Sequence, residues 1–158
     1  MGSGKSTIGQ ACAIALGWNF VDTDALIVEH TGMSILDIFE KHGETHFRDI
    51  ETAICRQALS SQASVVGLGG GSLGSQGVRD AVFAPGSLSV WLQISDREAE
   101  RRLGADTGRP LWKDGGIERW RALTRSRQVH YEQCVLHIEA DGRSVDSICR
   151  EICDAALR

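Results

Sequence analysis

The stretch Gly2-Ser-Gly-Lys-Ser-Thr7 stands at the beginning of the chain and leads directly into an apolar run over residues 8–16. It matches the second half of the phosphate-binding motif G-x-x-x-x-G-K-[ST]. Glycine lets successive backbone N–H groups point at one phosphate, and the N-terminus of a following helix adds partial positive charge. Lys5 would bridge the outer phosphates, and the Ser6 hydroxyl would bind Mg²⁺. A merely flexible terminus would not require an apolar helix at once, so we expect a nucleotide site.

The front of this motif is incomplete. The full motif has an earlier glycine and, before it, a buried strand, and neither precedes Gly2 in this sequence. Such a strand is usually central and buried on both faces of a parallel sheet. Its loss would cost many of the roughly 5–15 kcal/mol that stabilise a domain. We therefore expect that the first strand is missing and that the start of the chain is shortened or misassigned.

Short strand patterns alternate with helical patterns along the rest of the chain. This alternation predicts parallel βαβ units, and hence an α/β fold in which 158 residues form one domain. The predicted architecture is a three-layer αβα sandwich with a central parallel sheet. Strands are expected over 19–24, 63–68, 87–93 and 136–138. Helices are expected within 2–16, from 25 to 29, from 34 to a break at 42–43, and over 44–59, 96–103, 117–134 and 144–157.

Composition excludes several function classes. The 17 basic and 21 acidic residues give a net charge of −4, without the basic field of a general nucleic-acid binder. No apolar run approaches the roughly 18 residues of a membrane span, and the first residues do not form a signal peptide. The five cysteines are scattered, and Cys149 and Cys153 alone are too few for a metal site. We expect free thiols in a cytoplasmic protein that binds neither nucleic acid nor membrane.

Asp22-Thr-Asp24 lies at the end of a predicted strand, at the edge of the sheet where α/β proteins bind ligands. One carboxylate could hold Mg²⁺ through water, and the other could accept a hydrogen bond from a substrate hydroxyl and prepare it for attack. A purely structural alternative is that Asp24 caps a helix beginning at Ala25.

Arg48 and Glu51 lie three residues apart on one face of a predicted helix. Arg48 could bind a carboxylate through two hydrogen bonds while Glu51 orients the guanidinium, although such a pair is often only a surface ion pair. Gly69-Gly-Gly71 follows an apolar strand and would let backbone approach a ligand closely, unless it is simply a flexible loop.

Further arginines lie in the last third of the chain. Arg109 belongs to a polar loop over about 104–116 and could act as a lid residue that brings positive charge to a transferring phosphate. Arg127 could be a second carboxylate ligand. Because arginine is abundant here, no spacing rule alone selects these two; the others are Arg101, Arg102, Arg119, Arg121 and Arg125.

Taken in order, these segments resemble shikimate kinase over essentially the whole chain. The resemblance is carried by Gly2-Ser-Gly-Lys-Ser-Thr7, Asp22-Thr-Asp24, Ser34-Ile-Leu-Asp-Ile-Phe39, Phe47-Arg48 with Glu51, Gly69-Gly-Gly71, Arg109-Pro-Leu111 and Arg127 with Tyr131. It implies a P-loop fold like that of nucleoside monophosphate kinases. It also implies transfer of the ATP γ-phosphate to the 3-hydroxyl of shikimate with Mg²⁺, in the synthesis of chorismate and aromatic amino acids.

The resemblance also implies a role for each matched residue. It gives catalysis to Lys5, Asp24 and Arg109, and metal binding to Ser6 and, through water, Asp22. It gives nucleotide binding to Gly2, Ser3, Gly4, Lys5, Ser6, Thr7, Arg102 and Arg109. It gives shikimate binding to Asp24, Phe39, Arg48, Glu51, Gly69, Gly70, Gly71 and Arg127.

The sequence departs from the family pattern near the adenine site, where Val145 stands in place of a frequent proline, and in the segment before Tyr131, which lacks another. Two alternatives stay open. One is another small-metabolite kinase of the same fold, such as a gluconate kinase. The other is a binding domain for nucleotide or shikimate that does not catalyse. A monomer is expected for the shikimate kinase reading.

Overall fold

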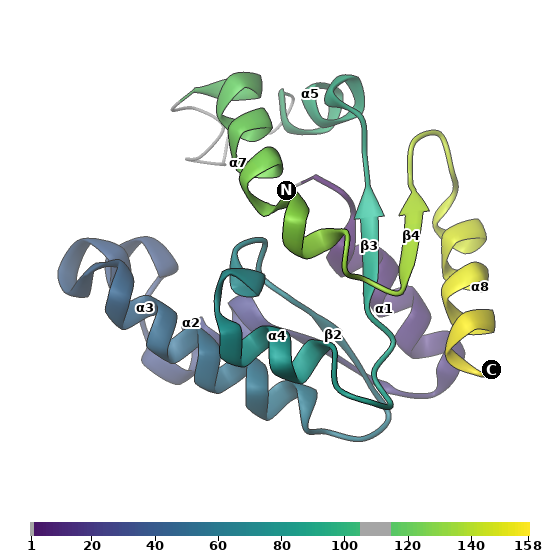
Figure 1. The fold of residues 1–158 in the computed structure, drawn as a ribbon, viewed down its shortest axis with the longest axis horizontal. Coiled ribbons are helices and arrows are strands. Elements are labelled where there is room, and N and C mark those ends of the chain that lie inside the picture. Colours follow the sequence, from purple (N-terminus) through teal and green to yellow (C-terminus); the bar gives the residue numbers. More distant parts are fainter. Residues whose placement is uncertain (1, 105–114) are drawn as a thin grey trace.

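The computed structural model describes residues 2–104 and 115–158 (Figure 1). Helices and short strands alternate along the chain, as the sequence predicts. In order they are α1 (Lys5–Leu16), β1 (Asn19–Asp22), α2 (Thr23–Thr31), α3 (Ile35–Leu59), β2 (Ser64–Gly67), the 3₁₀ helix η1 (Ser72–Gly74), α4 (Gln76–Val82), β3 (Val90–Gln93), α5 (Asp96–Gly104), α7 (Gly116–Tyr131), β4 (Leu136–Glu139) and α8 (Val145–Ala156).

Helix boundaries follow local signals in the sequence. Helix α1 ends at Gly17, whose φ of 68° lies in the left-handed region that glycine adopts without strain. The Ser34 side chain accepts a hydrogen bond from the Asp37 backbone N–H and so begins α3. The break expected near Gly43 is confirmed, because its φ of 80° and ψ of 172° interrupt the helical backbone of α3.

Two local expectations were wrong. Strand β1 ends at Asp22 and not at Asp24, because the Asp22 carboxylate accepts a hydrogen bond from the Asp24 N–H at 3.1 Å and begins α2. Asp22 is thus the cap, and the alternative of Asp24 capping a helix from Ala25 is incorrect. The sequence gives no signal for η1 and α4, which are too short to show a clear apolar period.

The four described strands form two separate parallel pairs. Strand β1 pairs with β2 from Asn19↔Ser64 to Asp22↔Gly67. Strand β3 pairs with β4 from Val90↔Leu136 to Gln93↔Glu139. No ladder joins β2 to β3 among the residues described, so the expected central sheet is observed as two halves. Residues of both β2 and β3 line one cavity.

Helices cover both faces of the strands. Val90 and Leu92 pack with α1 and α8, in a core that contains Ile8, Ile138 and Ile148. Trp91, which points to the other face of β3 because strand side chains alternate, packs against Tyr131 of α7 with ring centroids 5.5 Å apart. Figure 1 shows α8 beside β4 and α7 crossing toward β3. This arrangement is an α/β sandwich.

The carboxyl ends of β1 and β2 meet the N-terminus of α1. Strand β1 ends at Asp22 and β2 at Gly67, and both lie near Lys5, the first residue of α1. The chemistry-bearing segments of the sequence therefore gather at one edge of the half-sheet. Within residues 2–104 and 115–158, no helix combines the length and apolar character required to cross a membrane.

Candidate active site

The glycine-rich loop turns the backbone into α1. Gly2 and Gly4 have φ of 78° and 86°, values that residues with a Cβ atom adopt only with strain. Gly4 is the residue that precedes α1, and no side chain caps this end of the helix. The first N–H groups of α1 are therefore free to bind an anion, beside Ser3, Ser6 and Thr7, which line the same cavity.

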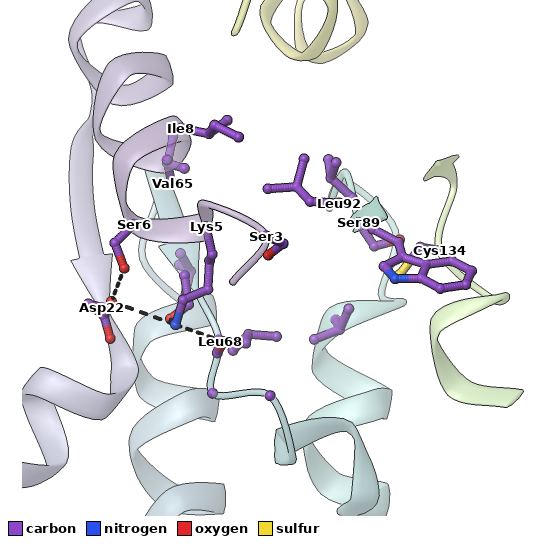
Figure 2. A pocket seen from close by; sticks show the side chains of 18 of the residues that line it. Ser3, Lys5, Ser6, Ile8, Asp22, Val65, Leu68, Ser89, Leu92 and Cys134 are labelled. Atoms are coloured by element: carbon purple, nitrogen blue, oxygen red, sulfur yellow. Dashed lines mark hydrogen bonds and ion pairs between the residues drawn. The ribbon is translucent and has the colours of Figure 1, made fainter. Parts of the chain in front are cut away.

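Lys5 connects this loop to the ends of both strands. Its ammonium donates to the Leu68 carbonyl at 2.9 Å and to the Gly67 carbonyl at 3.4 Å. It also lies 3.6 Å from Asp22 Oδ2 and 3.9 Å from Asp24 Oδ2. Figure 2 shows the side chain reaching from α1 toward Asp22 and Leu68. The Lys5 charge is thus held between the phosphate loop and the two carboxylates.

Ser6 and Asp22 form a pair of oxygen donors beside the loop. The Ser6 hydroxyl donates to Asp22 Oδ2 at 2.8 Å, from the first turn of α1 to the end of β1 (Figure 2). A hydroxyl and a carboxylate are ligands that Mg²⁺ accepts together with waters and phosphate oxygens. The residue types and their contact therefore fit the magnesium site that the sequence predicts.

Thr23 is a site residue that the sequence analysis did not identify. Its side chain is fully buried, and its hydroxyl donates to the Gly67 carbonyl at 3.3 Å and accepts from the Gly69 N–H at 3.1 Å. These two bonds fix the chain where it leaves β2. A threonine between two aspartates carries no local signal for this role, because its partners lie 44 and 46 residues away.

Asp24 has an unusual electrostatic environment. Burial raises the pKa of its carboxyl from the ordinary value of 3.8, and the nearby carboxylates of Asp22 and Glu51 raise it further. The positive charge of Lys5 opposes part of this rise. A carboxylate with a raised pKa is a better proton acceptor than an exposed one, which suits a general base.

Arg48 is held by a buried carboxylate. Its Nη1 donates to Glu51 Oε2 at 2.6 Å, and Glu51 is only 2% exposed. The other Glu51 oxygen accepts from the buried Ser72 hydroxyl at 2.8 Å, which the sequence analysis did not foresee. Arg48 also reaches Glu44 at 3.2 Å, on the exposed side of α3. The alternative of a simple surface pair therefore does not describe Glu51, although it does describe Glu44.

Arg48 and Arg127 converge at the glycine triplet. A Cβ atom built on Gly71 would lie 2.9 Å from Arg48 Nη1 and 3.4 Å from Arg127 Nη2. One built on Gly70 would lie 3.2 Å from Arg127 Nη1. The Tyr131 hydroxyl donates to the Gly70 carbonyl at 2.6 Å and ties this loop to α7. Tertiary packing thus selects Arg127 where spacing could not.

Gly69 lies at the centre of the acidic groups. A Cβ atom there would lie 2.6 Å from Asp24 Oδ1, 3.0 Å from Ser72 Oγ and 3.2 Å from Glu51 Oε1. A side chain at this position would therefore force Asp24, and with it Ser72 or Glu51, to move. The triplet is therefore not a merely flexible loop, because Gly69 and Gly71 are both enclosed by side chains.

Two further predicted residues lie at the margins. Phe39 stacks on Phe47 at 4.5 Å, and the Arg48 guanidinium lies 5.2 Å from the Phe47 ring, so Phe39 supports the arginine through Phe47. Arg102 donates to the Gly2 carbonyl at 3.0 Å and to Glu98 at 2.6 Å. Its neighbour Arg101 is exposed and contacts Glu98, so the structure distinguishes the two.

Arg109, which the sequence analysis predicts to be a catalytic lid residue, lies outside the described residues, as does most of the expected lid. Val145 begins α8 and is 36% exposed.

The site opens into one large cavity of about 1570 Å³. Its polar end contains Lys5, Ser6 and Asp22, and its apolar part lies between β2 and β3, where Val65 and Leu92 face it (Figure 2). The volume exceeds the roughly 300–1,000 Å³ of ordinary ligand pockets. It therefore includes more than the site.

Comparison with known proteins agrees with this geometry. A sequence profile described as "SKI: Shikimate kinase" matches residues 1–157. A shikimate kinase of Moorella thermoacetica is 35% identical over 98% of this chain and 89% of its own length. A shikimate kinase of Mycobacterium avium is 42% identical over 96% of this chain and 86% of its own length.

Solved structures show the same fold. The structure of shikimate kinase from Acinetobacter baumannii in complex with shikimate superposes with a TM-score of 0.91 at 30% identity, covering 99% of this chain and 88% of that one. A second, from Aquifex aeolicus, gives a TM-score of 0.77 at 26% identity, covering 99% of this chain and 91% of that one. A phosphate loop that faces paired carboxylates and paired arginines defines a small-metabolite kinase of the P-loop class. The chain belongs to the shikimate kinase family.

Proposed function

We propose that this protein transfers the γ-phosphate of ATP to the 3-hydroxyl of shikimate, giving shikimate 3-phosphate and ADP. The observation that carries the proposal is the convergence of Arg48 and Arg127 at Gly70 and Gly71, on the side of the site that also holds Asp24. A site for a small anion with several hydroxyl groups needs positively charged groups that bind the anionic group. It also needs a carboxylate that accepts a hydrogen bond from a hydroxyl. Family membership and the shikimate complex of the Acinetobacter baumannii relative support the same substrate.

The nucleotide would bind at the polar end of the cavity. Backbone N–H groups of residues 2–7 and the N-terminus of α1 would hold the phosphates, and Lys5 would neutralise their outer oxygens. Arg102, fixed to the Gly2 carbonyl, stands beside this loop and would contact the adenosine part. Arg109 is proposed to add positive charge from the lid.

Ser6 and Asp22 would hold Mg²⁺, the serine directly and the aspartate through water. Bound at this point, the ion would supply positive charge against the phosphate oxygens. The other carboxylate oxygen of Asp22 accepts the hydrogen bond from the Asp24 N–H that caps the N-terminus of α2. This link fixes the backbone that carries Asp24.

Asp24 would act as the general base. The hydroxyl proton passes to its carboxylate as the hydroxyl oxygen attacks the phosphorus atom and the bond to ADP breaks. Lys5 lies 3.9 Å from Asp24 and would stand between the base and the transferring group. The chemistry depends mainly on position and charge, since phosphoryl transfer requires little covalent help from protein.

The substrate carboxylate would be held by Arg48 and Arg127. Glu51 orients Arg48, Gly69 gives space for Asp24, and the backbone of Gly70 and Gly71 would contact the ring of the substrate. Phe39 would border the pocket through Phe47.

The decisive experiment measures ADP release from Mg-ATP with shikimate, with gluconate and without acceptor. We expect release that requires shikimate and falls by at least about 100-fold in Asp24→Ala and Arg48→Ala. Release with gluconate alone would assign a different kinase. Shikimate binding by calorimetry without any release would favour the non-catalytic alternative.

We also propose that the protein acts in the cytoplasm as a monomer, in the synthesis of aromatic amino acids. All five cysteines are free thiols, which suits a reducing compartment. Light scattering during size-exclusion chromatography tests the monomer directly, and a dimer mass would contradict it.

A further inference from the structure

Three cysteines from the two ends of the sequence, Cys12 on one side and Cys149 and Cys153 on the other, meet where α1 packs on α8. Cys12 lies on α1, and Cys149 and Cys153 lie one turn apart on α8. All three sulfur atoms lie within 4.8 Å of one another, and Cys149 Sγ is 3.8 Å from Cys153 Sγ. The sequence shows only the α8 pair, which by itself is too small for a metal site. The packing of α1 on α8 adds the third thiol, from 141 residues away.

The spacing of these sulfurs suits one three-coordinate ion. A pyramidal three-coordinate centre with bonds of about 2.3 Å to sulfur and angles of about 100° between them holds its three sulfurs about 3.5 Å apart. The observed spacing therefore needs only small side-chain rotations. Sulfur donors select soft ions over Mg²⁺ or Ca²⁺. Among the residues that the structure describes, this cluster is the one group of possible metal ligands with such spacing.

The apolar residues around the three thiols favour a bound ion whose complex with the thiolates has no net charge. Ile8, Ile138 and Ile148 pack around the thiols, and Cys12 and Cys149 are only 1% and 8% exposed. A net charge in such a core is costly. Cu⁺ with three thiolates leaves a charge of −2, and Zn²⁺ leaves −1, whereas a trivalent ion leaves none.

We propose that Cys12, Cys149 and Cys153 form a binding site for trivalent arsenic, taken up as arsenite. Neutral As(OH)₃ condenses with three thiols: three As–O bonds break, three As–S bonds form, and each thiol proton leaves with one hydroxide as water. Three waters are released, no oxidant is consumed and no charge is buried. Cys153 is half-buried and gives arsenite its route of entry.

Bound arsenic would link α1 covalently to α8. Helix α1 begins at Lys5, and its Cys12 lies two turns further along the same helix. A bridge from Cys12 to α8 therefore joins the helix that carries the phosphate loop to the C-terminal helix. Because this link uses no residue of the proposed kinase site, its test is independent of kinase activity.

Intact-mass spectrometry of the native protein, with sodium arsenite and no added thiol, tests the proposal. We expect a single adduct with the mass of one arsenic atom less three hydrogens, at one equivalent per chain. Cys153→Ser is the main variant because this half-buried position tolerates serine, and we expect at least about a tenfold loss of affinity. Cys12→Ser and Cys149→Ser should behave alike, with folding checked by circular dichroism. The matched control is Cys134→Ser, a half-buried cysteine outside the cluster, which should bind as the unaltered protein does.

Several results would overturn the proposal. One is the absence of an adduct at excess arsenite. Another is an adduct that has lost only two hydrogens and survives Cys12→Ser unchanged, which would indicate a pair on α8 alone. Stoichiometric binding of Cu⁺ in a competing-chelator titration, without binding of arsenite, would show that charge does not select the occupant.

Discussion

Replacing Glu51 by glutamine removes the negative charge behind Arg48 while keeping the size of the side chain. The Glu51 carboxylate is 2% exposed, accepts from Arg48 at 2.6 Å and from Ser72 at 2.8 Å, and lies beside Gly69. Glutamine can still accept from Arg48 through its oxygen. The change therefore tests the charge that orients the guanidinium more than the presence of a hydrogen bond.

The magnitude follows from the burial of this contact. Hydrogen bonds to charged groups contribute about 1.5–3 kcal/mol when little exposed to water. Each 1.4 kcal/mol is a factor of ten. If Arg48 binds the substrate carboxylate, we expect kcat/KM for shikimate to fall by about 10- to 100-fold in Glu51→Gln, mainly through KM. The KM for ATP should change by less than about twofold, because the nucleotide loop is not touched.

Glu44→Gln is the matched control, because Glu44 contacts the same arginine from the exposed side. The Glu44 side chain is 68% exposed and lies 3.2 Å from Arg48. Exposed pairs contribute about 0–1 kcal/mol, so we expect less than about a fivefold change in the shikimate KM. Steady-state kinetics with each substrate varied in turn measure both variants. Equal losses in the two variants, or no loss in Glu51→Gln, would refute the argument that the buried carboxylate orients Arg48.

Three other perturbations give defined outcomes. Lys5→Met should lower kcat by at least about 100-fold in the coupled ADP assay, since it removes the cation between the loop and the carboxylates; near-normal turnover would exclude Lys5 from catalysis. Gly69→Ala should also abolish most activity, because its Cβ would lie 2.6 Å from Asp24 Oδ1, while Gly74→Ala, with no atom within 4 Å, should not; similar activities would contradict the close fit. Asp24→Asn should abolish turnover without lowering the melting temperature at pH 7. The raised pKa of Asp24 means that the folded state binds its proton more tightly than the unfolded state, so this group lowers stability as pH rises through the folded pKa, and asparagine removes that effect. Thermal unfolding between pH 4 and pH 7 checks this, and a lower melting temperature for Asp24→Asn at pH 7 would show that its charge stabilises the fold.

Local signals predicted most helix boundaries correctly. Ser34, Gly17 and Gly43 act through their own backbone and near neighbours, so their roles are visible in the sequence. The end of β1 was misjudged because Asp22 and Asp24 can both cap a helix, and sequence does not say which carboxylate turns back to the backbone. The two half-sheets depend on which strand edges meet, which is a property of the whole chain.

In the candidate site, too, some residues are predicted by local sequence and others are found only in the structure. Lys5 and Ser6 are found from six contiguous residues, because a loop that wraps a phosphate is a local structure. Thr23 and Ser72 carry no such signal, since each acts on a partner more than 20 residues away. The roles of Arg48, Arg127, Asp24 and the lid residue Arg109 stay predictions until the kinetics are measured.

The sequence by itself predicts a phosphate-binding loop and determines that the chain belongs among the α/β proteins, because glycine geometry, helix dipoles and apolar alternation act over a few residues. Only the tertiary structure decided which arginine meets Arg48. It brings α7 against the loop after β2, with Tyr131 bonded to Gly70 from 61 residues away. It also decided that Cys12 joins Cys149 and Cys153. These contacts between residues far apart in the sequence depend on how the helices pack on the strands. Packing involves the whole core, so no short stretch of sequence predicts it.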